Sequence, residues 1–177
     1  SGLPRDGVSS DFEGDGRPFG DGFDRGADEW TDASACYARV DGGRVYTDLQ
    51  RAVDVAPSGG RVQVAGRCAG VQERAGVTQT LYLSQNLTVR GGYTVTDWVN
   101  PRYRTTLDAQ GLGRVAYVAS GAAITLENLH MRGGVAGDGG GGGVYVSPGA
   151  TATLHNNVIY DNSTTGPGGG VHNNQGW

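Results

Sequence analysis

Apolar residues in this chain recur in short segments that alternate with polar residues. Nine such segments, each of three or four residues, lie at 61–64, 80–83, 87–90, 115–118, 123–126, 129–131, 144–146, 152–154 and 158–160. A period of two is typical of β-strands that bury one face of a sheet. The pattern therefore predicts an all-β domain assembled from many short strands.

One segment ahead of these strands follows a helical period instead. Its apolar face consists of Val45, Leu49, Ala52, Val53 and Ala56. Thr47, with Gln50 three residues later, has the spacing of a capping box, and Pro57 with the glycines after it ends the pattern. We expect a helix at about 48–56.

The alternating segments also repeat in sequence, with a period in the high twenties. The matching pairs are 141–144 with 168–171, 114–120 with 143–147, and 129–132 with 158–161. A longer spacing, from 87–92 to 129–134, is interpreted as one turn plus an insertion that carries Trp98, Pro101 and Tyr103. An antiparallel β-sandwich predicts alternation without repeated identities. The repeat favours a parallel β-helix, a solenoid whose turns bury their apolar faces against one another.

Composition agrees with such a fold. Glycine supplies 33 of 177 residues, about 19% against a usual ~7%, and clusters at 91–92, 133–143 and 168–170, where we expect sharp, closely stacked corners. The net charge of −4 is too small to enforce disorder. The longest apolar runs are far below the ~18 residues of a membrane span. Because no signal segment opens the chain, we expect a targeting sequence to be absent or already removed.

Charge divides the chain into two parts. Residues 1–35 hold nine acids and three arginines, a balance of −6, whereas the rest holds nine acids and eleven arginines, a balance of +2. This predicts an acidic, glycine-rich segment at 1–35 and a β-helix domain at 36–177. All 14 basic residues are arginine. They form no basic patch in the sequence, so we expect no nucleic-acid partner.

Two cysteines, Cys36 and Cys68, flank the helical segment. A pair without metal-ligand spacing favours a disulfide formed in an oxidising compartment, and two buried free thiols are the alternative. A bridge that closes about 33 residues stabilises a fold by roughly 3 to 4 kcal/mol.

Several motifs resemble known repeats. Gly-Gly-Gly-Val at 141–144 and Asn-Asn-Val-Ile-Tyr-Asp-Asn at 156–162 look like the Gly-Gly-x-Ile and Asn repeats of bacterial surface adhesins and polymorphic outer-membrane proteins. Segments similar to the opening of secreted β-helix repeat proteins of filamentous phototrophic bacteria lie at 36–40, 48–53, 62–68, 87–93 and 106–111. The resemblance covers about 36–177. It implies a short right-handed parallel β-helix, an N-terminal capping helix, paired cysteines and secretion or display at the cell surface.

One motif stands in an unusual place. Residues 15–29 resemble the segment that usually closes such β-helices at their C-terminal end, yet here they precede the cap, while 168–177 stop within a turn. In one interpretation, 1–35 ends a preceding domain of a tandem array. In the other, it docks on the open C-terminal turn of a neighbouring subunit by adding strands, which builds a filament. The residues assigned to this contact are Arg17, Pro18, Phe19, Phe23, Asp24, Asp28, Glu29 and Trp30 on one side and Val171, His172, Asn173, Asn174 and Trp177 on the other.

Other polar groups are candidate sites for a metal ion or a sugar. Asp11, Glu13 and Asp15 resemble the start of a calcium loop, but Gly22 stands where such a loop has glutamate, so a solvated turn is the favoured interpretation. His130, His155 and His172 are unevenly spaced, which favours surface or stacked histidines over metal ligands. Side-chain ladders rather than sugar contacts are expected of Asn156, Asn157, Asn162, Asn173 and Asn174. Asn86 and Asn162 begin glycosylation sequons.

We expect a structural or adhesive protein that assembles with copies of itself, without a cofactor and with surface glycans as a further candidate partner. The alternative is a polysaccharide-binding or polysaccharide-cleaving β-helix domain of a larger surface protein. Cleavage needs clustered carboxylates, whereas these are scattered through the body: Asp97, Asp108, Glu127, Asp138 and Asp161. Four to five turns provide only about 20 Å of sheet, which is short for a substrate groove. We therefore expect no enzyme.

Overall fold

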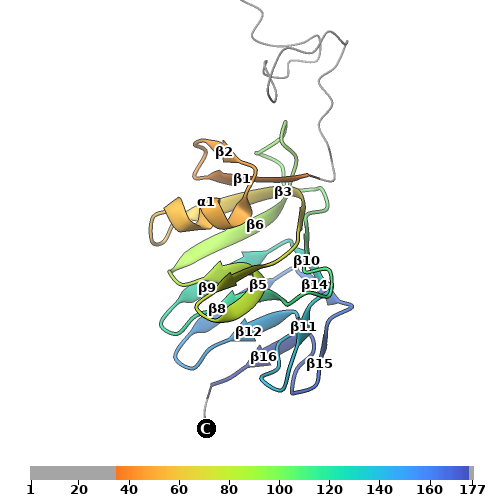
Figure 1. Cartoon of the computed structure of the whole chain (residues 1–177). Coiled ribbons are helices and arrows are strands. Elements are labelled where there is room, and N and C mark those ends of the chain that lie inside the picture. The colour runs from red at the N-terminus through yellow and green to blue at the C-terminus, as the bar shows by residue number, and fades with distance from the viewer. Residues whose placement is uncertain (1–34, 176–177) are drawn as a thin grey trace, which may run out of the picture. The chain divides into compact units, whose positions relative to one another are not determined.

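The computed structural model describes residues 35–175, which lie within the second of two units of the chain, Ala33–Trp177 (Figure 1). These residues form one helix, α1 (Leu49–Val55), and many short strands. The strands are β1 (Cys36–Val40), β2 (Val45–Tyr46), β3 (Arg61–Ala69), β4 (Gln72–Arg74), β5 (Val77–Leu83), β6 (Leu87–Tyr93), β7 (Thr106–Asp108), β8 (Arg114–Val118), β9 (Ala123–Glu127), β10 (His130–Arg132), β11 (Val135–Ala136), β12 (Val144–Val146), β13 (Thr151–His155), β14 (Val158–Tyr160), β15 (Ser163–Thr164) and β16 (Val171–Asn173). The expected all-β class is confirmed.

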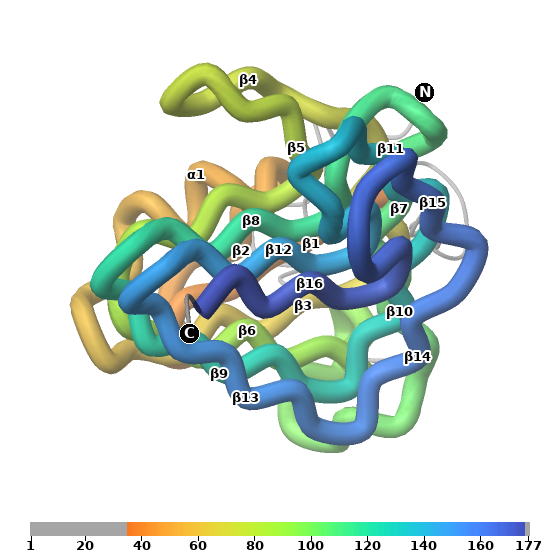
Figure 2. Tube along the Cα trace, turned by 90° about the horizontal axis from the view of Figure 1, so that it is seen from below, coloured from red at the N-terminus to blue at the C-terminus, as the bar shows by residue number. Residues whose placement is uncertain are grey.

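Most strands pair in parallel, in three series that we call ladders. The first ladder is β3-β6-β9-β13, the second is β3-β7-β10-β14 and the third is β5-β8-β12-β16. The long strand β3 serves two ladders, because its first part pairs with β6 and its last part with β7. Along the chain, successive strands join the first, second and third ladder in turn. Figure 2 shows this winding from below, with β6, β9 and β13 along one side.

The sheets are mixed rather than purely parallel. At the N-terminal end of the ladders, β1 lies antiparallel to β3 and to β2. The hairpin partner β4 lies antiparallel to β5. Two short strands, β11 and β15, add a small parallel pair of their own.

Apolar side chains fill the space between the ladders in register. Each ladder contributes an inward row, and the rows are Val62, Val89, Leu126 and Leu154 in the first ladder, Cys68, Leu107, Met131 and Ile159 in the second, and Leu81, Ala116, Val144 and Val171 in the third. The first three members of every row are buried. Alternation of apolar and polar residues thus produces one continuous core, because each strand turns its apolar positions to the same interior.

All nine predicted strands are present, but two predicted repeat matches are wrong. The match of 129–132 with 158–161 is one residue out of register, because Val158 pairs with His130 rather than with Leu129. The match of 87–92 with 129–134 also fails, because β6 pairs with β3 and β9 while β10 belongs to another ladder. The shared Arg-Gly-Gly has a different place in each segment: Gly92, with φ of 98°, lies within β6 beside a register shift with β3, whereas Gly133, with φ of 66°, follows the end of β10.

Some strands carry no alternating pattern and were not predicted. In β7, for example, Leu107 is the single inward apolar side chain of a three-residue strand. The glycine-rich corners meet the expectation of close stacking: a Cβ on Gly134 would lie 1.9 Å from the carbonyl oxygen of Gly142. No larger residue fits there without moving the backbone.

The helix begins one residue later than its capping-box pattern predicted. Asp48, not Thr47, is the N-cap, and its carboxylate accepts a hydrogen bond from the backbone N–H of Arg51 at 3.2 Å. Gln50 is therefore free for another role. Its buried side-chain amide bonds both backbone groups of Tyr82, accepting from the N–H at 2.8 Å and donating to the carbonyl at 2.9 Å. The amide occupies the free edge of β5 as a further strand would.

The expected disulfide is confirmed. Cys36 on β1 and Cys68 on β3 are bonded, with 2.02 Å between the sulfur atoms, and the bridge spans a sequence separation of 32. Cys68 also occupies the first position of the inward row of the second ladder. The bridge therefore holds β1 over the N-terminal end of the core.

Replacing both cysteines, C36S with C68S, should lower the free energy of unfolding by about 3 to 4 kcal/mol, because the unfolded chain regains the entropy of an open loop. Urea unfolding of the double variant measures this loss. Reduced wild-type protein is the matched control and should unfold at a similar urea concentration. A loss below about 1 kcal/mol would contradict a stabilising role.

Candidate functional site

The two ends of the ladders differ. At the N-terminal end, β1, β4 and the Gln50 amide lie against edges that would otherwise be free. At the C-terminal end, β13, β14 and β16 each pair on one side only within residues 35–175. We call these three the terminal strands. Their outer edges present backbone N–H and C=O groups that can pair with a further strand.

The inward rows become exposed at the terminal strands. Leu154 and Ile159 are only partly buried, and Val171 is 39% exposed, although the residues before them in each row are buried. A hollow of about 320 Å³ opens here. Its lining is Val146, Ala150, Thr151, Ala152, Leu154, Val171, Asn173 and Gln175. The core is thus open to solvent at this end of the described chain.

The residues predicted for the open end are placed as follows. Val171 and Asn173 occupy inward positions of β16 and line the hollow. His172 faces outward, packs edge-on against Tyr145 at 5.5 Å, and bonds the carbonyl of Gly139 through Nδ1. Asn174 donates to the Tyr145 hydroxyl at 2.7 Å.

The remaining predicted residues of this contact and of the calcium loop lie outside the described residues. They are Arg17, Pro18, Phe19, Phe23, Asp24, Asp28, Glu29, Trp30 and Trp177, with Asp11, Glu13 and Asp15. Within 35–175, no group of three or more His, Cys, Asp or Glu side chains is arranged to hold a metal ion. No helix of that part is long and apolar enough to span a membrane.

Asparagine side chains bond each turn of chain to the one before it. Asn156 donates to the Asn128 side chain at 2.6 Å. Asn157 accepts from the N–H of Leu129 and donates to the carbonyl of Leu126. Asn162 accepts from the N–H of Gly134 at 2.7 Å and donates to the carbonyl of Met131 at 3.1 Å. The predicted side-chain ladder is present at Asn156 with Asn128, whereas Asn157 and Asn162 bond backbone groups of the preceding turn.

Both asparagines that begin glycosylation sequons, Asn86 and Asn162, use their side chains in hydrogen bonds within the fold. The amide of Asn162 is committed to two backbone groups, and Asn86 accepts from the N–H of Ala123 at 2.8 Å. A glycan on Asn162 would replace one of the two N–H donors of this partly buried amide and leave a single N–H for Met131. In the folded protein, the Asn162 side chain therefore links two turns through these two hydrogen bonds.

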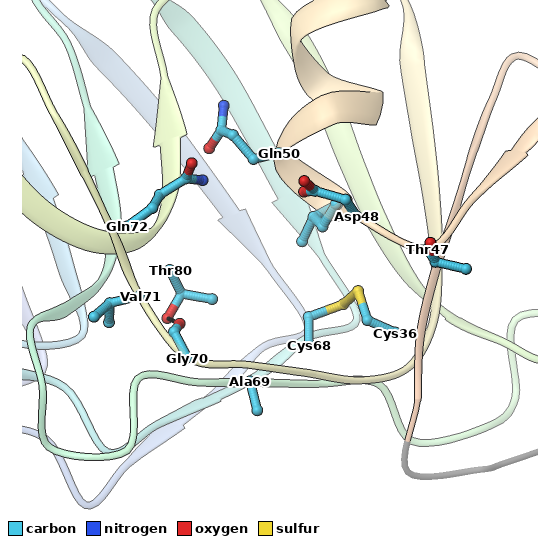
Figure 3. Close-up of a pocket in the computed structure, with 11 residues that line it drawn as sticks. Cys36, Thr47, Asp48, Gln50, Cys68, Ala69, Gly70, Val71, Gln72 and Thr80 are labelled. Carbon is cyan, nitrogen blue, oxygen red and sulfur yellow. Dashed lines mark hydrogen bonds between the residues drawn. A yellow bond between two sulfur atoms is a disulfide. The ribbon is translucent and has the colours of Figure 1, made fainter.

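A second hollow lies beside the disulfide, between α1 and the β4–β5 hairpin (Figure 3). Its volume is about 290 Å³. Figure 3 shows Gln50 and Gln72 on the side away from the sulfur atoms. The polar groups here already serve the fold, since Thr80 donates to the carbonyl of Gly70 at 2.7 Å and Asp48 caps α1.

The strongest charge cluster lies on the outward face of the second ladder. Asp108 on β7 lies between Arg67 on β3 and Arg132 on β10, and both guanidinium groups approach the same carboxylate oxygen at 2.7 Å. The Asp108 side chain is 3% exposed, whereas both arginine side chains are 40% exposed. Two accessible cations are therefore held by one covered anion.

Burial raises the pKa of Asp108, but hydrogen bonds from Arg67 and Arg132, with one from the N–H of Gln110, outweigh it and hold the pKa below its usual value. Beside the cluster, burial and the positive charge of Arg104 lower the pKa of His130. A lowered pKa favours the neutral form of His130, and two arginines against one carboxylate leave the cluster a net positive charge.

The residues predicted from the sequence include neither this cluster nor a row on the outward face of the third ladder. There Tyr82, Tyr117 and Tyr145 stack, with ring centroids 5.6 and 5.1 Å apart. Tyr117 and Tyr145 are register partners of β8 and β12, so the repeat itself carried that signal. Asp108 and its arginines are separated by 24 and 41 positions, which no common period connects.

Comparison of the chain with protein-family models, curated proteins and solved structures finds no match.

Replacing Asn162 with alanine should lower the free energy of unfolding by about 1 to 3 kcal/mol, because two partly buried backbone groups lose their partners. Denaturant unfolding measures the effect. The matched control is N173A, on an exposed side chain of the last strand, and should change stability by less than about 0.5 kcal/mol. Equal losses of unfolding free energy in both variants would contradict a stabilising role for the two hydrogen bonds of Asn162.

Stability should also depend on Asp108 in acid. Because its folded pKa lies below the unfolded value of about 3.9, its contribution is present above that pH and lost as pH falls through the folded pKa. Urea unfolding from about pH 6 to about pH 2 should show this decline, and D108N should remove part of it. An unchanged pH profile in D108N would be inconsistent with the pairing.

Proposed function

We propose that residues 36–175 form a short right-handed parallel β-helix, closed at its N-terminal end by α1 and β1. The support is the order in which strands join the three ladders, together with the unbroken parallel registers between the later strands of each ladder. In such a solenoid each turn covers the apolar face of its neighbour. Among residues 35–175, the turn that holds β13, β14 and β16 has no such neighbour on its outer side.

We propose that a second copy of the chain covers this turn, and that the protein is a structural or adhesive unit that assembles end to end outside the cell. The observation that carries the proposal is that all three inward rows are buried until their last member, at Leu154, Ile159 and Val171. Exposed apolar side chains beside unpaired strand edges favour addition of another strand. Because the N-terminal end is covered differently, the contact is head to tail and propagates.

In this proposal the acidic segment 1–35 of one subunit supplies the strands that complete the terminal strands of the next. Its aromatic side chains belong to Phe19, Phe23 and Trp30. Each is largely apolar and small enough for the hollow of about 320 Å³. The disulfide is typical of proteins from oxidising compartments and supports an extracellular location.

We propose no catalytic activity. Three of the five carboxylates named for polysaccharide cleavage are held in ion pairs within the described chain. Asp97 pairs with Arg102, Asp108 with two arginines, and Glu127 with Arg90 at 3.4 Å.

A charge on the inward face of β13 should block assembly. L154K places a lysine among the exposed apolar side chains, a device that blunts strand edges, whereas T153K places the same charge on the outward face of the same strand. Light scattering after size exclusion and electron microscopy should show assemblies for the wild type and T153K, and monomers for L154K. Equal association of all three proteins, or monomers throughout, would contradict the proposal.

A peptide of residues 11–32 tests the role of the acidic segment in the same assay. Added in excess to the full chain, it should shorten the assemblies, while a scrambled peptide should not. If L154K abolishes association but the peptide has no effect, the contact at the terminal strands is supported. The claim that segment 1–35 fills it is then wrong.

A further inference from the structure

The Arg67–Asp108–Arg132 cluster has more hydrogen-bond donors than its carboxylate can use. A guanidinium carries five N–H donors. Oδ2 of Asp108 receives Nη2 of Arg67 at 2.7 Å, and Nη2 and Nε of Arg132 at 2.7 and 2.8 Å. Oδ1 receives the N–H of Gln110 at 2.9 Å. The carboxylate is nearly saturated, while both arginines retain donors.

The arginine side chains that carry those donors are partly accessible, although Nε of Arg67 is buried and has no hydrogen-bond partner within residues 35–175. Both arginine side chains are 40% exposed, although the carboxylate between them is covered. Two cations and one anion leave a charge of +1, and the positive charge of Arg104 acts on the neighbouring His130. The buried anion also fixes the guanidinium groups in place, so an incoming anion meets donors that are already oriented.

The surface beside the cations is apolar and aromatic. Tyr160 pairs with Arg132 across β14 and β10, and its ring meets His130 edge to face at 6.3 Å. Val158, next to His130 on the same outward face, is 47% exposed. A strip of C–H and ring surface next to paired guanidinium groups suits a ligand with a carboxylate on a sugar ring, whose C–H face packs on aromatic side chains.

We propose that this outward face of the second ladder binds the uronic acid residues of an acidic polysaccharide, with the ligand carboxylate on Arg67 and Arg132 and its ring against Tyr160 and Val158. The site faces outward from the ladder, although Tyr160 and Val158 belong to β14, one of the terminal strands. Binding therefore uses outward side chains and not the free backbone edge of β14 on which the proposed assembly rests.

Binding of polygalacturonate to the full chain tests the proposal, by calorimetry in EDTA at about 20 and about 150 mM NaCl. The wild type should bind polygalacturonate and not its fully methyl-esterified form, in which the carboxylates are blocked. R132Q and R67Q should each weaken binding about tenfold or more, since each loses a charge-assisted hydrogen bond. The matched control is R90Q, on the outward face of the first ladder, and it should change affinity by no more than about twofold.

Two further variants separate local contacts from net charge and from folding. R132K keeps the charge but not the planar fork, and should bind more weakly than the wild type. Y160A leaves Asp108 and both arginines in place, and should also weaken binding. Equal loss in R90Q and R132Q, or equal affinity for polyglutamate and polygalacturonate, would show a response to charge alone and overturn the proposal, as would no binding at low salt.

Discussion

The registered stacking of inward apolar side chains is the constraint on which the rest of this structure depends. Rows such as Cys68, Leu107, Met131 and Ile159 require each strand to lie directly over the one before it. A shift by one residue would turn every apolar side chain of that strand to solvent. Stacking therefore keeps the register between the later turns nearly constant. It also brings the backbone of neighbouring corners close together, as at Gly134 and Gly142.

Stacking of this kind leaves two ends, and the chain treats them differently. At the N-terminal end the Gln50 amide replaces a strand at Tyr82, while the disulfide holds β1 against β3. In the later turns, Asn157 and Asn162 bond to the preceding turn, and Asn156 bonds to the Asn128 side chain of that turn. The terminal strands have no such partner within residues 35–175, and this difference is the physical basis of the proposed assembly.

Much of the fold followed from local pattern, and the failures have physical causes. Alternation located all nine predicted strands because each buries one face. The helix was found from its apolar face, but its N-cap was misplaced by one residue: Asp48 and Thr47 are both good caps, and the tertiary bond of Gln50 to Tyr82 removed the partner that a Thr47 box needs. Strand β7 was not predicted because Leu107 is its single apolar residue, which is too few for an alternating pattern.

The strand-rich class, the period and the glycine corners were predictable because they depend on local pattern, and the lone cysteine pair already favoured a disulfide over two free thiols. That Asp108 meets Arg67 and Arg132 is visible only in the folded chain. Their sequence separations of 41 and 24 differ from the common register. The hairpin of β4 with β5 and the segment 94–105 lengthen particular turns, and only folding shows which residues those lengths bring together.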